Sequence, residues 1–137
     1  MRHRNEGQSL VEMALTLPIL VLLLFGILEL GRMLDAWIVA TNAAREGARY
    51  AAVGTPSDQV IDRTYAYLQE GLAGRSDVAY SKGWISVSYA QAPVPGTPVT
   101  VTAQVRLTIF TPLFQAIVSP NPFPVQGSAT MALQSGG

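Results

Sequence analysis

The sequence predicts an α+β fold, with a long N-terminal helix, a second short helix and a small antiparallel β-sheet head of about three strands. Three observations predict it. A long apolar run near the N-terminus leads into small residues at helical spacing, a shorter helical pattern follows a Gly/Pro break, and the remainder alternates apolar and polar residues. A chain of 137 residues has room for one domain plus an anchoring segment.

The anchoring segment is the uncharged run MALTLPILVLLLFGIL at residues 13–28. Extended to Leu10 and Leu30, it reaches the ~20 residues that span a bilayer. Arg2 and Arg4 precede it, so we expect the N-terminus in the cytoplasm and the chain beyond the segment outside. The run is too long for a secretory signal and lacks an A-x-A site after it, so we expect it to be retained.

The long helix is predicted from Ser9 to about Ala52, and Pro18 alone interrupts the pattern. Ser9 and Glu12 have the spacing of a capping box, which places the helix start there. Pro18 removes one backbone hydrogen bond and is expected to kink or loosen the helix. A helix of this length would measure roughly 65 Å, so its second half must project into water or pack on a globular part.

The second half of this helix has a small-residue arc and a polar arc. The small residues are Ala40, Ala43, Ala44, Gly47, Ala48 and Ala51, and the polar ones are Asn42, Arg45, Glu46 and Arg49. Small residues spaced by four allow another backbone to approach closely. An ordinary amphipathic helix with alanines toward the core gives the same pattern, and both interpretations predict a close-packed face.

Gly54 and Pro56 end this pattern, and a shorter helix is predicted from about Asp58 to Leu72. Its apolar stripe is Ile61, Tyr65, Leu68 and Leu72, and Gly74 is its stop. We expect three parts, a basic leader at residues 1–7, the long helix with its apolar segment at residues 8–53 and the head at residues 54–137.

The head alternates in three segments. The predicted inward residues are Ile85, Val87 and Tyr89 in the first, Val99, Val101, Ala103, Val105, Leu107 and Ile109 in the second, and Val125, Ala129, Met131 and Leu133 in the third. Such alternation indicates an antiparallel sheet with one buried face, which we expect to pack on the small-residue half of the long helix. Residues 110–124 are predicted to form an ordered loop, whose Leu113, Phe114, Ile117 and Val118 either cover the core or contact a neighbouring subunit.

No catalytic or cofactor site is predicted. The chain has no cysteine and its charges balance, which argues against thiolate chemistry and nucleic-acid binding. His3 is the only histidine and lies in the leader, and no phosphate-binding or dinucleotide-binding glycine motif is present. Asp58, Asp62 and Glu70 are expected to form a solvated face. We therefore expect no enzyme activity, no metal and no cofactor.

The N-terminal part of the chain, up to about Val53, carries a more specific signal. A basic leader, Gly7 and the string QSLVE before an apolar helix resemble the processing site of type IV pilin-like proteins. The fuller string GQSLVEMALTLPILVLLLFGILELGR, followed by TNAAREGARYAA, is similar to TadE-like pilin proteins of the tight-adherence (Tad) pilus machinery. The resemblance covers Gly7 to about Val53, and the head resembles the family only in pattern.

The resemblance implies a processing and assembly route. Prepilin peptidase would cut between Gly7 and Gln8, which makes Glu12 the fifth residue of the mature chain. Glu12 would pair with the N-terminal amine of an adjacent subunit, because a carboxylate in a dry filament core needs a partner. The implied partners are the same or other pilin subunits, prepilin peptidase, the inner-membrane assembly platform and, before assembly, membrane lipid. The implied destination is the extracellular pilus.

Several roles stay open at this point. Glu12 could instead be an acid near the headgroups, stabilised by the helix dipole. Glu29 and Arg32 form either an interfacial i,i+3 pair or a subunit contact. Arg45, Glu46 and Arg49 either join subunits or face water. The chain could be a major or a minor pilin, or a permanently anchored bitopic protein whose outer domain binds a partner or the cell wall.

Overall fold

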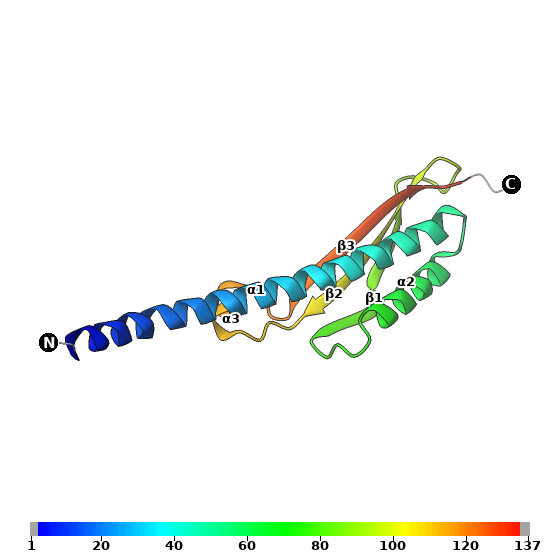
Figure 1. Ribbon diagram of the computed structural model, residues 1–137. Helices are drawn as coiled ribbons and strands as arrows, with labels where there is room; N and C mark the ends of the chain where they lie inside the picture. The colour runs from blue at the N-terminus through cyan, green and yellow to red at the C-terminus, as the bar shows by residue number, and fades with distance from the viewer. Residues whose placement is uncertain (1–2, 135–137) are drawn as a thin grey trace. The chain divides into compact units, whose positions relative to one another are not determined.

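The structure is a computed structural model that describes residues 3–134, with side chains from residue 7 onward. Its elements in order are α1 (His3–Ala52), α2 (Ser57–Gly71), β1 (Val78–Tyr89), β2 (Pro98–Leu107), α3 (Pro112–Ile117) and β3 (Phe123–Ala132). The strands form one antiparallel sheet in the order β1-β2-β3, which confirms the predicted α+β class (Figure 1).

The chain divides into two compact units, and the boundary falls inside α1. Residues 1–32 form the N-terminal unit, and residues 33–137 form the packed unit, which contains the C-terminal part of α1 and all other elements. The two are described separately below.

Helix α1 begins before the predicted start. Its first residue is His3, and Ser9 lies inside the helix, so the predicted N-cap at Ser9 is wrong. A capping box ends a helix only where the preceding residues favour another conformation, and His3 to Gln8 contain no proline to impose one. The C-terminal bound at Ala52 agrees with the prediction.

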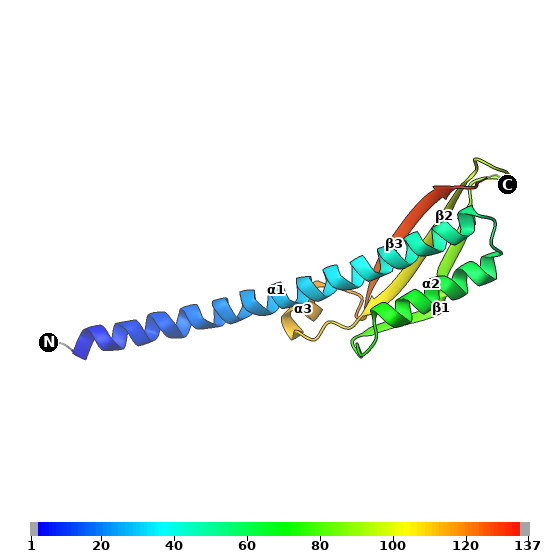
Figure 2. The ribbon, with the colours of Figure 1, turned by 45° about the vertical axis from the view of Figure 1, so that its right-hand side comes forward.

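In the packed unit, α1 and α2 lie on one face of the sheet (Figure 2). The small-residue arc of α1 is buried there in full, with every one of its alanines at 0% exposure. Strand β3 crosses α1 at Gly127. The two backbones approach so closely that a Cβ atom on Gly127 would lie 2.3 Å from the Thr41 backbone nitrogen. Gly47 is equally close to α2, where its Cβ would meet the Thr64 hydroxyl at 2.2 Å. The predicted close-packed face is confirmed.

Helix α2 buries a face rotated slightly from the predicted one. Val60, Thr64 and Leu68 are its buried residues, while Ile61 and Tyr65 are half-buried. The Thr64 hydroxyl donates to the Val60 carbonyl oxygen at 2.8 Å. A threonine whose hydroxyl is satisfied within its own helix can face the core, which the apolar pattern alone does not reveal.

The sheet shows the predicted alternation. All the predicted inward residues of the second segment, from Val99 to Ile109, are buried. Strand β1 starts earlier than predicted, at Val78, and its register with β2 shifts between Tyr80 and Ile85. This irregularity breaks the period-2 pattern upstream of Trp84, which is why the alternation reveals only the second half of the strand.

The predicted ordered loop contains the short helix α3. It is fastened to Ile109, whose backbone N–H donates to Asn121 Oδ1 at 3.1 Å and whose carbonyl oxygen accepts from Gln115 Nε2 at 2.6 Å. Within the described chain none of Leu113, Phe114, Ile117 and Val118 is buried. The structure therefore does not support a core-covering role for these four side chains.

Candidate functional site: the apolar N-terminal helix

The N-terminal unit presents apolar side chains around its whole circumference. All residues from Leu10 to Phe25 are exposed, including Leu15, Leu20 and Leu24 on different sides of the helix. By length and composition, α1 from Gly7 is the described helix that could cross a membrane. A helix that is apolar on every side requires lipid or other protein around it.

The polar exceptions stand in the first turns of this helix. Gln8 Nε2 donates to Glu12 Oε1 at 3.1 Å, and both side chains are exposed. One turn further on, the Thr16 hydroxyl donates to the Glu12 carbonyl oxygen at 2.8 Å. Glu12 is thus held within its own helix, one turn from Gln8.

Gly7 has neither a packing nor a conformational reason to be glycine. It lies in α1, its backbone is not in the left-handed region, and a Cβ atom there would have no neighbour within 4 Å. Glycine inside a helix costs about 1 kcal/mol relative to alanine, so the fold alone disfavours it.

Pro18 lies inside α1, and the helix continues on both sides of it. The proline leaves the carbonyl oxygen of Ala14, four residues earlier, without its usual helical donor, because it has no N–H. The predicted kink at Pro18 stays a prediction.

Glu29 and Arg32 form the i,i+3 ion pair that their spacing predicts. Arg32 Nη1 donates to Glu29 Oε2 at 2.7 Å, and Glu29 is only 3% exposed. Whether the pair serves at a membrane interface or in a subunit contact stays a prediction. The basic residues expected to set the topology are Arg2, which lies outside the described residues, and Arg4, whose side chain is not described.

The three charged candidates on the C-terminal part of α1 differ in their surroundings. Arg49 Nη2 donates to Glu46 Oε1 at 3.2 Å, so these two satisfy each other. Arg45 is exposed, and no carboxylate or aromatic ring among the described residues pairs with it.

Two ion-pair groups connect elements of the packed unit. Arg75 donates to Asp77 Oδ2 at 2.7 Å and also pairs with Asp35 of α1, and the hydrogen bond to Asp77 raises the pKa of its guanidinium. Lys82 of β1 donates to Asp62 Oδ1 of α2 at 2.5 Å, and this hydrogen bond raises the pKa of the ammonium group. Asp62 is exposed, as the predicted solvated face requires, and its pair with Lys82 spans twenty residues, a separation that no helical spacing predicts.

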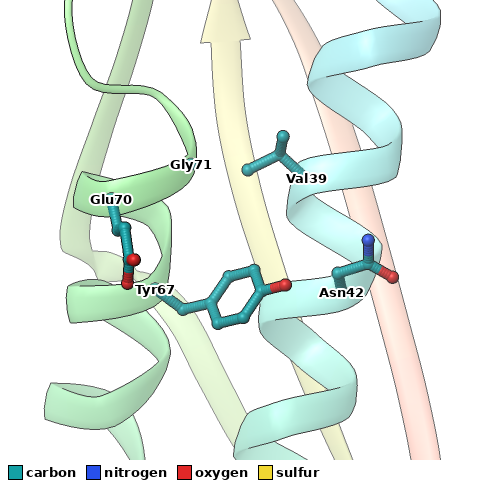
Figure 3. Close-up of a pocket in the computed structure, with 5 residues that line it drawn as sticks. All are labelled: Val39, Asn42, Tyr67, Glu70 and Gly71. Carbon is teal, nitrogen blue, oxygen red and sulfur yellow. The ribbon is translucent and has the colours of Figure 1, made fainter.

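Two shallow grooves open on the packed unit. One, of about 280 Å³, lies between α1 and α2 and is lined by Val39, Asn42, Tyr67, Glu70 and Gly71 (Figure 3). The other, of about 450 Å³, is lined by residues that include Pro56, Tyr89, Pro93 and Leu133. Among the described residues, no three His, Cys, Asp or Glu side chains gather as metal ligands would.

Comparison with known proteins bears on the N-terminal part of the chain. Residues 7–49 match the family model described as TadE-like protein. No curated protein and no solved structure matches the chain. The matched segment contains Gly7, Glu12, Pro18 and most of the small-residue arc, which are the features on which the predicted resemblance rests. Over residues 7–49 the chain is similar to the TadE-like family.

Proposed function

We propose that the chain is a pilin-like structural subunit of a Tad-type pilus. It is inserted in the membrane as a precursor, cut by prepilin peptidase after Gly7, and packed through its apolar N-terminal helix into an extracellular filament. The observation that carries this proposal is the all-round exposure of large aliphatic side chains from Leu10 to Leu24. Lipid can cover such a helix before assembly, and the helices of neighbouring subunits can cover it afterwards.

Gly7 supports the processing step. Nothing in the described chain requires a glycine there, so recognition by another protein is the simplest reason for it. A protease needs close access to the main chain, and glycine offers it without a side chain in the way.

Glu12 supports the assembly step. Cleavage after Gly7 makes Gln8 the first residue and creates a positive amine one helical turn from the Glu12 carboxylate. In the filament core, the amine of an adjacent subunit pairs with Glu12 and fixes the axial register. In this structure the Glu12 carboxylate accepts a hydrogen bond from the Gln8 side-chain amide, which is neutral and exposed. A positively charged amine makes a stronger hydrogen bond and therefore displaces the amide readily.

The first test is the N-terminal sequence of the protein extracted from membranes. We expect it to begin at Gln8, and Gly7→Val should leave it beginning at Met1. Gly31→Val is the matched control, because Gly31 is another α1 glycine with open space around its Cβ position, and it should still be cut. If the unaltered protein begins at Met1, the chain is a permanent bitopic anchor.

The second test concerns assembly. Glu12→Gln keeps the size of the side chain but removes its charge, so we expect normal membrane insertion and loss of the protein from sheared filaments. Gln8→Ala removes only the neutral hydrogen-bond partner and should still assemble. A normal filament yield from Glu12→Gln contradicts the ion pair. The amount of the chain in sheared filaments also separates a major from a minor subunit, because a minor one appears only as a trace.

A further inference from the structure

The groove between α1 and α2 has the chemistry of an arginine site. Val39 and Asn42 come from α1, while Tyr67, Glu70 and Gly71 come from α2. The Tyr67 ring reaches from α2 toward Asn42 (Figure 3). At one end the helices touch, since a Cβ atom on Gly71 would lie 2.7 Å from Val39 Cγ1.

Two of the groups that line the groove suit a guanidinium. Glu70 supplies a carboxylate and Tyr67, three residues before it on α2, supplies an aromatic ring. A guanidinium is planar, donates two parallel hydrogen bonds to a carboxylate and stacks on aromatic faces, which a lysine ammonium does less well. Glu70 is exposed and has no ion-pair partner among the described residues.

Among the arginines whose side chains the structure describes, all but one have a carboxylate or an aromatic ring as a partner. Arg32, Arg49 and Arg75 pair with carboxylates. Arg63 stacks 5.3 Å from the Tyr50 ring centroid, and Arg106 stacks 4.2 Å from that of Trp84.

That leaves Arg45, which is exposed on α1 without a carboxylate or a ring in the described part of the chain. Arg45 and the Glu70 carboxylate, each without an ion-pair partner among the described residues, are complementary in charge.

We propose that Arg45 of one copy of this chain occupies the groove of a second copy, against Glu70 and Tyr67. In a filament each copy places its Arg45 on one neighbour and receives the Arg45 of another neighbour in its own groove, so the contact is head-to-tail and repeats in an open chain. A two-fold dimer, in which two copies exchange the same Arg45–Glu70 contact with each other, is the closed arrangement that the test below distinguishes from it. This inference rests on the proposed filament function and names the partner, a second copy, and the contact between neighbouring packed units.

The absence of cysteine from the chain gives a direct test. The double variant Arg45→Cys/Glu70→Cys, in the full chain in its own cells, should form disulfide-linked ladders longer than dimers after mild oxidation. The control is Arg45→Cys/Asp58→Cys. Asp58 is also an exposed acid without an ion pair among the described residues, but it lies roughly 18 Å from Glu70 along α2 and should not link. Dimers alone, or no linked product, would overturn the head-to-tail contact.

Charge reversal tests the same contact without a covalent trap. Arg45→Glu and Glu70→Arg should each lower the amount of the chain in sheared filaments by roughly tenfold, because each places like charges together. The combined variant Arg45→Glu/Glu70→Arg should restore it. No loss in the single variants, or no restoration in the combined one, would contradict the pairing. If filaments still contain the chain that begins at Gln8, the proposed function stands even where this inference fails.

Discussion

The two units of the molecule use one helix in opposite ways. In the N-terminal unit α1 carries leucine, isoleucine and valine, and these side chains are exposed on every side. In the packed unit the same helix turns alanine and glycine toward the sheet and α2, and these are buried at close backbone distances. Exposed large aliphatic side chains are available to bind lipid or other protein chains, whereas small residues allow close packing between elements of the same chain.

The polar contacts differ in the same sense. In the N-terminal unit, Glu12 accepts from Gln8 one turn away, so the contact adds nothing beyond the helix itself. In the packed unit, Arg75 reaches Asp35 of α1, and Lys82 reaches Asp62 of α2. These ion pairs join elements far apart in the sequence, while the buried side chains between the elements supply most of the stability of the packed unit. We therefore expect substitutions to destabilise the packed unit more than the N-terminal unit.

Truncating one leucine in each unit should give the largest difference in stability between them. Leu68 is fully buried in α2, so Leu68→Ala should lower the free energy of unfolding of the packed unit by about 2–5 kcal/mol. Leu23 is 56% exposed, so Leu23→Ala should leave that free energy unchanged. Urea unfolding of the full chain in detergent, followed by the fluorescence of Trp84 after Trp37→Phe, measures both. Equal losses would mean that the two units do not differ in internal packing.

A smaller effect tests the close approach of β3 to α1. Gly127→Ala would place a Cβ atom 2.3 Å from Thr41 N and 2.4 Å from the Ala40 carbonyl carbon, both main-chain atoms that cannot rotate away. We expect destabilisation by about 3 kcal/mol, at the upper end of the usual range for overpacking. Gly83→Ala in β1 is the control, because its Cβ would meet only the Ser81 hydroxyl at 3.9 Å. The same unfolding measurement applies, and a neutral Gly127→Ala would mean that β3 moves freely on α1.

Much of this fold follows from periodicity in the sequence. The small-residue arc of α1 and the alternation from Val99 to Ile109 each predict the buried face correctly, because burial on one side imposes a period. The features missed have no period. Asn121 holds Ile109 through a side chain twelve positions away, and the start of α1 at His3 contradicts a local capping signal at Ser9.

The candidate site divides along the same line. Gly7, Glu12 and the apolar run form a contiguous pattern, so the sequence alone is enough to predict them as a site. The groove at Tyr67 and Glu70 exists only once α2 lies beside α1, so the sequence showed Glu70 merely as a solvated acid. Arg45, in contrast, differs from Arg49 already in the sequence, because Glu46 stands three residues before Arg49 and no acid stands three or four residues from Arg45.

Lys82 and Asp62 form an ion pair that joins β1 to α2 at the surface, and removing it should lower the free energy of unfolding least. The pKa of Lys82 is raised above its ordinary value of 10.5 because its ammonium group donates to Asp62. A raised pKa in the folded state means that the pair contributes to stability below pH 10.5, and that this contribution is lost as the pH rises through the folded pKa.

The difference in urea midpoint between the unaltered chain and Lys82→Gln should therefore be small and constant from neutral pH, and should vanish in strongly alkaline solution. Asp58→Asn, which removes an unpaired acid from the same helix, should give no such alkaline change. A Lys82 difference that survives undiminished in alkali would mean that uncharged contacts of the side chain, and not its charge, connect the two elements.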